Sequence, residues 1–256
     1  MVILGIKINN LLCEEILREL EVLLTKQNKK FYQIITVNPE FILQAQKDKE
    51  FKEILNSKYT LNIADGIGLK FASWRQGKNL KCRWAGIDLM QEVLKLANQN
   101  KQKIFLVANK NGLSNWQETA SAIKKVYSNI EVLGINLRED AASPRQQNIV
   151  RQQFIPNIKK LQLRISTYNP DIIFCSLGAP IQEKILYSLR NNKNVKLAMG
   201  VGGSFDFLTG KIKRAPKWLQ VIGLEWLYRL IQEPSYRWRR IFRAVIIFPI
   251  RVLFKK

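Results

Sequence analysis

The sequence predicts an α/β fold: a parallel sheet flanked by helices, followed by a basic, amphipathic, helical C-terminal appendage. Two observations predict this arrangement. Short apolar runs that end in turn signals alternate with segments of helical length, which is typical of parallel strands joined by helices. From Trp218 onward these runs stop, and only basic, aromatic, amphipathic segments remain. We therefore expect an α/β core over residues 1–210 and an appendage over residues 211–256.

The elements follow one another in a regular order. The runs expected as strands are KFYQIITVN (30–38), YTLNIADG (59–66), KIFLVAN (103–109), IEVLGIN (130–136), PDIIFCSLGAP (170–180) and VKLAMGVGG (195–203). Helices are expected over 41–55, 86–100, 114–127, 144–169 and 181–190, with an interruption at Pro156 because proline breaks the helical hydrogen-bond pattern. Pro234 separates the two appendage segments, 218–234 and 235–256.

Polar residues at the ends of these strands are the candidate ligand contacts, because open parallel sheets bind ligands beyond the carboxyl ends of their strands. They are Thr36, Asn38, Asp65, Asn109, Gln182 after the Gly178-Ala179-Pro180 turn, and the glycines Gly200, Gly202 and Gly203. The alternative is that such residues only cap helices or form turns. Both roles are compatible for Thr36 and Asn38.

The stretch GVGGSFDFLTGKIKRAP (200–216) is glycine-rich but matches neither common nucleotide-binding pattern. Gly210-Lys211 is followed by Ile212, where a P-loop needs Ser or Thr. Gly200 and Gly202 are followed by Phe205, where the dinucleotide fingerprint needs a third glycine. A Rossmann oxidoreductase is therefore disfavoured. These glycines either let the backbone approach a ligand or only permit the bend of the chain.

Composition restricts the chemistry. The chain contains no histidine, so catalytic triads with histidine are excluded and a general base must be Asp, Glu, Lys, Tyr or Cys. The three cysteines are scattered and no CxxC occurs, which predicts no disulfide, a reducing compartment and no structural zinc site. No D-x-D pattern surrounds Asp65 or Asp206, and we expect a reaction without metal or cofactor.

The charge pattern points to a polyanionic partner. The formal net charge is +22, and residues 211–256 carry twelve Lys or Arg, two Glu and half of the six tryptophans. Arginine and tryptophan on amphipathic helices suit an anionic membrane surface. The alternatives are ordinary helices with solvated arginines, or a nucleic-acid surface, for which no known motif is present. No signal peptide is evident, and no apolar run reaches the ~20 residues of a spanning helix.

Five blocks resemble the WecG/TagA/CpsF family of bacterial glycosyltransferases. They are TVNPEFI (36–42), ADGIGL (64–69), RWAGID (83–88), LGAPIQEK (177–184) and the stretch from Gly200 to Arg240. The resemblance implies a Rossmann-like body and an inverting, metal-independent reaction. That reaction would move N-acetylmannosamine, its uronic acid or a related sugar from a UDP-sugar to a polyprenyl-diphosphate-linked acceptor in cell-surface polysaccharide synthesis. The site would lie at the inner face of the cell membrane.

The resemblance also assigns roles to residues. Asp65 corresponds to the catalytic base, and Thr36, Asn38, Arg83 and Gln182 to the pocket. Basic residues of the appendage would approach the acceptor diphosphate and the membrane: Arg214, Arg229, Arg237, Arg239 and Arg240. The sequence departs from the family after KIFLV and over the insertion at 141–168, so the donor sugar stays open. Also open are a homo-oligomer and, as the alternative function, a non-catalytic polybasic protein that binds membranes or nucleic acid.

Overall fold

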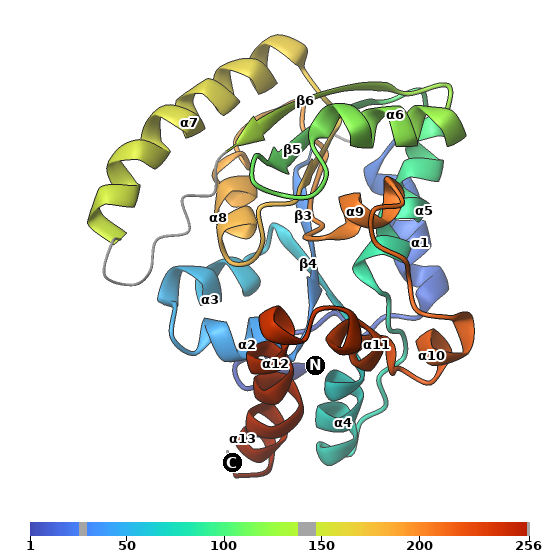
Figure 1. Cartoon of the computed structure of the whole chain (residues 1–256), viewed down its shortest axis with the longest axis vertical. Coiled ribbons are helices and arrows are strands. Elements are labelled where there is room, and N and C mark those ends of the chain that lie inside the picture. Colours follow the sequence, from blue (N-terminus) through green and yellow to red (C-terminus); the bar gives the residue numbers. More distant parts are fainter. Residues whose placement is uncertain (26–29, 138–146, 255–256) are drawn as a thin grey trace.

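The computed structural model describes residues 1–25, 30–137 and 147–254, and for 147–157 and 236 the backbone only. Within these ranges six parallel strands form one sheet in the order β4-β3-β8-β7-β5-β6, and a separate two-stranded hairpin precedes it. Helices cover both faces of the sheet (Figure 1). The predicted α/β fold class is confirmed.

The strands of the sheet are β3 (Tyr32–Val37), β4 (Thr60–Ala64), β5 (Lys103–Asn109), β6 (Glu131–Leu137), β7 (Ile172–Cys175) and β8 (Leu197–Gly200). The helices around it are α1 (Cys13–Leu23), α2 (Pro39–Ala45), α3 (Lys49–Leu55), α4 (Ile67–Arg75), α5 (Gly86–Gln99), α6 (Trp116–Val126), α7 (Gln147–Tyr168), α8 (Ile181–Ser188) and α9 (Ser204–Leu208).

The two faces of the sheet are buried by different helices. Successive strand residues point to opposite faces, so Ile34 and Ile35 enter different parts of the core. Ile34 joins the cluster that contains residues of α1, α5 and α6, whereas Ile35 joins residues of α2 and α3. Farther along the sheet, residues of α7 and α8 cover the face that contains Phe105. Burial on both faces explains why the strands read as nearly continuous apolar runs.

Several elements were not expected from the sequence. The hairpin of β1 (Val2–Ile3) and β2 (Ile6–Lys7), and the helices α1, α4 and α9, add to the predicted set. The interruption expected at Pro156 is wrong, because the backbone of α7 is helical through that residue. A proline removes one hydrogen bond of a helix and can bend it without ending it.

The cysteines are also placed differently from the expectation. Cys13 and Cys82 form a disulfide, with their Cα atoms 5.2 Å apart, so the prediction of no disulfide is wrong and the inference of a reducing compartment loses its support. A separation of 69 residues conceals their proximity in the sequence. Asn10 brings the two segments together, since its side chain donates to the Asn79 carbonyl and accepts from the Lys81 N–H.

The appendage is helical, as predicted. It contains α10 (Lys217–Val221), α11 (Glu225–Gln232), α12 (Pro234–Phe242), a π-helical turn η2 (Arg243–Ile247) and α13 (Phe248–Phe254). Gly223 divides the first expected helix with a φ of +81°, a left-handed conformation that favours glycine. Pro234 starts α12, where its missing N–H costs nothing. Pro249 cannot donate to the preceding turn, which accounts for the π-helical turn before α13.

The last helix is attached to the core. Phe248 is fully buried among residues of α2 and α4, and Figure 1 shows α13 (red) beside these helices. Because α13 packs against the core, the expected division of the chain into a core that ends at residue 210 and a separate appendage stays a prediction. Within the described part of the chain, no helix combines the length and apolar character that crossing a bilayer requires.

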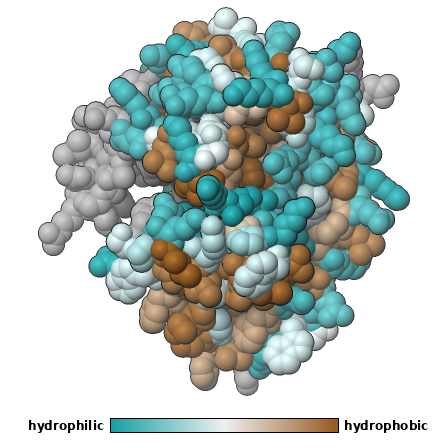
Figure 2. Space-filling view, turned by 45° about the vertical axis from the view of Figure 1, so that its right-hand side comes forward, coloured by the Kyte–Doolittle hydropathy of each residue, from teal (hydrophilic) through white to brown (hydrophobic). Residues whose placement is uncertain are grey.

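The outer surface of the appendage is apolar. Figure 2 shows brown side chains gathered over the lower part of the molecule. The appendage residues that are exposed and apolar are Trp218, Val221, Ile222, Leu227, Ile231, Trp238, Phe242, Val245, Ile246, Ile250, Leu253 and Phe254. Soluble monomers rarely expose so many large apolar side chains together, so this face is suited to an apolar contact.

Candidate active site

The predicted polar residues gather at one edge of the sheet. Asp65 directly follows β4, Thr36 and Asn38 end β3, Gly200 ends β8, and Gln182 follows β7 by one turn. These four strands are consecutive neighbours in the sheet. The carboxyl ends of parallel strands share an edge, so residues far apart in the sequence meet there. The candidate site therefore lies at the β4-β3-β8-β7 edge.

Asp65 occupies a tight turn between β4 and α4. Its N–H donates to the Val37 carbonyl at 2.7 Å, which continues the pairing of β4 with β3. Gly66 follows with a φ of +83°, a conformation that side chains rarely adopt. A Cβ atom at Gly68 would lie 2.6 Å from Cγ of Pro39, so only glycine fits there. The TVNPEFI and ADGIGL blocks are thus packed directly against each other.

The electrostatic surroundings of Asp65 suit a proton acceptor. The pKa of its carboxyl group is raised to about 6, chiefly by burial and also by the nearby Glu225 carboxylate. The guanidinium groups of Arg83 and Arg229 and the Gly66 N–H oppose this rise. A carboxyl group with this pKa is mostly ionised at neutral pH and is a better base than an ordinary aspartate. The aspartate is therefore poised to accept a proton.

Arg83 lies between the sheet edge and the appendage. Its Nη2 donates to the Gln220 carbonyl of α10 at 3.1 Å, and the rest of the side chain is exposed. Two links hold the segment that carries it: the Trp84 N–H donates to the Ala64 carbonyl at 3.0 Å, and Cys82 is bonded to Cys13. Arg83 is thus presented beside Asp65 with most of its guanidinium accessible.

Thr36 and Asn38 lie next to each other at the end of β3. Thr36 is 8% exposed, and a Cβ atom at Gly86 would be 3.2 Å from its Oγ1, so the start of α5 approaches it closely. Asn38 caps α2, because its Oδ1 accepts the Phe41 N–H at 3.1 Å. The capping role considered for Asn38 is therefore present. The cap uses the amide oxygen and does not require the amide nitrogen.

Gln182 is buried and binds the turns that follow β7 and β8. Its Oε1 accepts the N–H of Gly178 at 3.0 Å and the N–H of Gly202 at 3.2 Å. Only 3% of the residue is exposed, so it is not the solvent-exposed first-turn residue that the sequence also allowed. Gln182 fixes the shape of both glycine turns, and it can influence a ligand through them.

Three of the five predicted arginines form ion pairs with carboxylates. Arg214 binds Asp88 through two hydrogen bonds and also Glu225 at 3.2 Å. Arg237 binds Glu233 at 2.6 Å, and Arg240 binds Glu40. Sequence reasoning missed these acidic partners, although the Asp88 of the RWAGID block could have been noticed as a candidate. Arg214 thereby connects α5 with α11.

Arg229 and Arg239 lie on aromatic rings. The Arg239 guanidinium is 5.3 Å from the ring centroid of Trp238 on the exposed surface. The Arg229 guanidinium is 4.9 Å from the ring centroid of Phe207, and its Nη2 would be 3.5 Å from a Cβ atom at Gly203. Burial lowers the pKa of Arg229, and its Nε has no hydrogen-bond partner among the described residues. Arg229 is thus the appendage arginine beside the glycine turn and Asp65.

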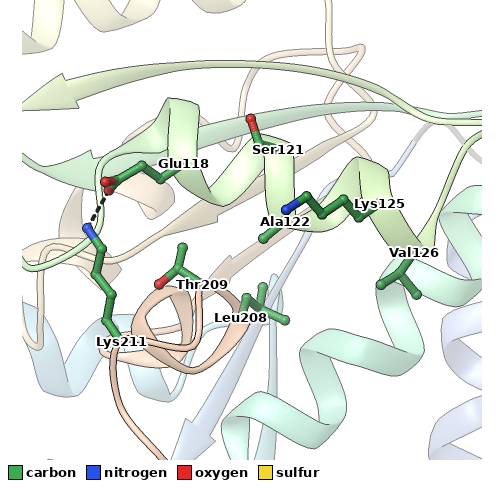
Figure 3. Close-up of a pocket in the computed structure, with 8 residues that line it drawn as sticks. All are labelled: Glu118, Ser121, Ala122, Lys125, Val126, Leu208, Thr209 and Lys211. Carbon is green, nitrogen blue, oxygen red and sulfur yellow. Dashed lines mark hydrogen bonds and ion pairs between the residues drawn. The ribbon is translucent and has the colours of Figure 1, made fainter.

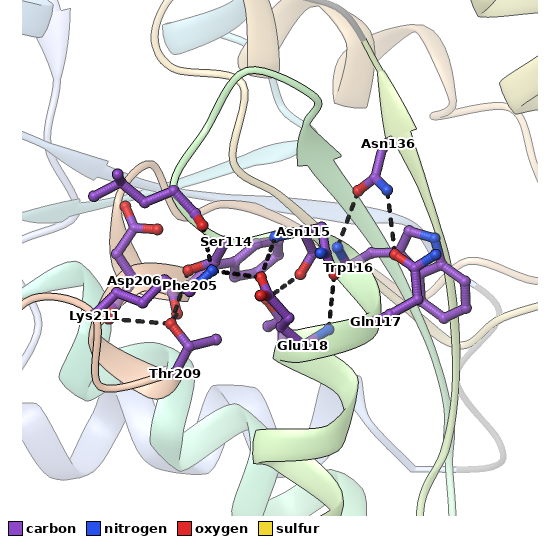
Figure 4. A network of polar contacts seen from close by, with 12 residues as sticks. Ser114, Asn115, Trp116, Gln117, Glu118, Asn136, Phe205, Asp206, Thr209 and Lys211 are labelled. Carbon is purple, nitrogen blue, oxygen red and sulfur yellow. Dashed lines mark hydrogen bonds and ion pairs between the residues drawn. The ribbon is translucent and has the colours of Figure 1, made fainter.

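A separate cavity lies between α6 and α9 and contains none of the predicted site residues. Figure 3 shows it, with a volume of about 380 Å³. At its rim Lys211 binds Glu118 at 2.6 Å and donates to the Leu113 carbonyl, and Ser114 bonds Thr209 at 2.7 Å (Figure 4). These contacts fix the first residue of the appendage to α6. The residues around this cavity therefore include those that attach the start of the appendage to α6.

Comparison with known proteins identifies the family. The model of the Glycosyl transferase WecG/TagA/CpsF family matches residues 1–256. The chain belongs to this family. It is therefore a glycosyltransferase, and the family resemblance seen in the five sequence blocks is confirmed.

Three relatives of this WecG/TagA/CpsF member carry the name N-acetylglucosaminyldiphosphoundecaprenol N-acetyl-beta-D-mannosaminyltransferase. The protein of Bacillus subtilis strain 168 is 34% identical over 81% of this chain and 73% of its own length. That of Bacillus spizizenii W23 is 32% identical over 86% of this chain and 78% of its own. That of Staphylococcus aureus MRSA252 is 30% identical over 98% and 91%.

Proposed function

We propose that this glycosyltransferase moves N-acetylmannosamine, or its uronic acid, from a UDP-sugar to a polyprenyl-diphosphate-linked acceptor in cell-surface polysaccharide synthesis. N-acetylmannosamine is favoured, because the relatives are named for transferring that sugar to N-acetylglucosaminyldiphosphoundecaprenol. The observation that carries the proposal is the position of Asp65 at the end of β4, with Arg83 and Arg229 in its electrostatic surroundings.

The proposed chemistry is a single inverting displacement. The Asp65 carboxylate takes the proton of an acceptor hydroxyl while that oxygen attacks the anomeric carbon of the donor sugar. The bond between the anomeric carbon and the UDP oxygen breaks, and UDP leaves with the electron pair. The raised pKa of Asp65 matches this role, since it makes the carboxylate a stronger base while leaving it ionised at neutral pH.

The donor diphosphate is assigned to the glycine turns and to Arg83. Guanidinium groups bind phosphate oxygens with two parallel hydrogen bonds, and the Arg83 side chain is exposed beside Asp65. Gly202 and Gly203 lack side chains, which lets a ligand approach the backbone closely, whereas the space beside Gly200 is filled by the side chains of Gln182 and Glu183. Thr36 and the amide nitrogen of Asn38 complete the pocket near the attacked carbon. No metal or cofactor is part of this proposal.

The acceptor is assigned to the appendage. Its apolar outer face would rest on the anionic inner face of the cell membrane, which holds the lipid tail of the acceptor. Arg229 is assigned to the acceptor diphosphate, because it is the appendage arginine that lies beside the glycine turn. Arg214, Arg237 and Arg240 would have to exchange carboxylate partners for phosphate, whereas Arg239 is exposed for a lipid headgroup.

The test is UDP release by the purified protein with a panel of UDP-N-acetylhexosamines and a diphosphate-linked N-acetylglucosamine lipid. We expect UDP-N-acetylmannosamine to be the best donor and D65N to remove turnover while the circular dichroism spectrum is unchanged. Near-wild-type turnover by D65N would overturn the role of Asp65. Turnover with a different donor only would overturn the assigned sugar, and none with any donor would favour a non-catalytic binding protein.

A further inference from the structure

Three buried polar side chains lie together beneath the glycine turns. Gln33 on β3 is 0% exposed, and Gln182 and Glu183 at the start of α8 are 3% and 1% exposed. Gln33 Nε2 donates to the Glu183 carbonyl at 3.1 Å, which joins β3 to α8. Burying polar side chains costs free energy unless they form hydrogen bonds, so a cluster of three requires a structural explanation.

Glu183 holds the side-chain amide of Gln182. Gln182 Nε2 donates to Glu183 Oε1 at 2.7 Å. This bond fixes which end of the amide faces the turns, so Gln182 Oε1 is the atom that accepts from Gly178 and Gly202. If the amide were reversed, its NH₂ group would face two N–H donors and both bonds would be lost. Glu183 therefore determines the orientation on which both turns depend.

The space for this pair is provided by the sheet. A Cβ atom at Gly200 would lie 2.5 Å from Gln182 Nε2 and 2.6 Å from Glu183 Oε1. The amide and the carboxyl group thus lie directly against the backbone of β8 where that strand ends. Glycine at position 200 is explained by this contact, and a ligand is not needed to account for it.

The surroundings of Glu183 favour its protonated form. Its Oε2 is buried without a hydrogen-bond partner among the described residues, and so is Gln33 Oε1 in the same cluster. The pKa of Glu183 is raised to about 7, chiefly by burial, against hydrogen bonds from Gln182 and from the backbone that lower it. A protonated carboxyl group still accepts from Gln182 through Oε1, and protonation turns the unpartnered acceptor Oε2 into a hydroxyl.

We propose that Glu183 is a positioning residue for sugar transfer: its side-chain oxygen, which needs no charge for this role, orients Gln182, whose amide oxygen holds the glycine turns of the donor site. The effect on transfer rests on the function proposed above. The orienting of Gln182 does not, and it can be measured without a substrate. Glu183 itself touches no reacting atom, since it lies behind Gln182 and β8.

The kinetic test compares E183Q with E183M. Glutamine is the uncharged counterpart of the protonated acid, and methionine keeps the length but cannot accept from Gln182. We expect E183M to raise the KM for the UDP-sugar about tenfold with an unchanged acceptor KM, and E183Q to stay within about threefold of the natural protein. The Q182A/E183M double variant should be no worse than Q182A alone, because both act through one contact.

Two results would overturn the proposal. One is a loss in E183Q equal to that in E183M, which would mean that the charge is needed. The other is a KM for the UDP-sugar in folded E183M that equals the KM of the natural protein. Amide hydrogen exchange supplies a test that needs no activity: peptides covering 176–180 and 200–204 should exchange about tenfold faster in E183M and unchanged in E183Q. Unchanged amide exchange in both variants would contradict the role of Glu183 in holding the glycine turns, even if sugar transfer were established.

Discussion

The guanidinium of Arg240 holds both carboxylate oxygens of Glu40, a residue 200 positions earlier in the chain, at 2.7 to 3.1 Å. Glu40 is in the first turn of α2, directly after Asn38 and Pro39. The ion pair therefore ties α12 to the turn that forms one wall of the site. Several predictions about this site depend on such contacts between the appendage and the strand ends.

Removing this ion pair should loosen the appendage while leaving the core folded. Arg240 is 46% exposed, so E40Q is expected to lower the free energy of unfolding by only about 0.5 kcal/mol. Limited proteolysis should nevertheless cut within residues 233–243 faster than in the natural protein. E92Q, which removes a helical surface pair with Lys95, is the matched control and should not change cleavage there. Equal cleavage in E40Q and E92Q would contradict the role of the pair.

Turnover should depend on the ionisation of Asp65. Its pKa is about 6 in the folded protein, so kcat/KM should fall about tenfold per pH unit below pH 6 and level off above pH 7. The measurement is UDP release between pH 5 and 8 at low substrate concentration, with stability checked at each pH. A flat profile across this range would contradict Asp65 as the base.

Stability should respond to pH through Glu183. Its pKa is raised from 4.5 to about 7 on folding, so below pH 4.5 both states are protonated and ionisation has no effect on stability. As pH rises from 4.5 to 7 the unfolded state binds fewer protons than the folded state, so folding loses roughly 3 kcal/mol of stability, and the loss levels off above pH 7. E183Q lacks this loss and should gain about 5 °C in Tm over the natural protein at pH 8, but little at pH 4.5. The same Tm difference at both pH values would contradict a buried, protonated Glu183.

Arg229 and Arg239 should have separable effects. Arg229 is partly buried beside the glycine turn, so R229A is expected to lower kcat/KM about a hundredfold with a lipid-linked acceptor. Arg239 lies on the exposed face with Trp238, so R239A should weaken flotation with anionic vesicles and change turnover of a short-chain acceptor less than threefold. If R239A reduced turnover of the short-chain acceptor as much as R229A, the separation would be wrong.

The disulfide should hold the segment that carries Arg83. Replacing Cys82 with serine opens the loop between Cys13 and Cys82, for which chain entropy predicts a loss of about 4 kcal/mol. Maleimide labelling under denaturing conditions should count one thiol in the oxidised natural protein and three after reduction. Three reactive thiols in protein purified without reductant would contradict the bond. C175S is the control, because Cys175 is buried in β7 away from this segment.

The grouping of the candidate site residues could be predicted from the sequence, because parallel strands end at a common edge. Asp65, Thr36, Asn38 and Gly200 follow apolar runs, and strand order alone brings them together. The partners of the arginines could not be predicted. Asp88 and Arg214 are 126 residues apart, and no sequence period connects them.

The burial of Gln182 and Glu183 beneath the glycine turns could not be predicted from the sequence either. In the sequence Gln182 and Glu183 resemble the first turn of an exposed helix, and only the packing of α8 against β8 buries them. Likewise the fully buried Phe248 lies in a segment whose pattern predicts a surface helix. Tertiary contacts, rather than local propensity, decide these positions.

Phe248 has a further consequence. Its ring lies 3.7 Å from where a Cβ atom of Gly68 would be, three residues beyond Asp65. The helices with the apolar outer face are thus packed directly beside the turn that carries Asp65. The distance between Asp65 and any surface that these helices contact is therefore fixed. Acceptors would then be selected by how far their sugar hydroxyl stands from the lipid, in addition to the identity of that sugar.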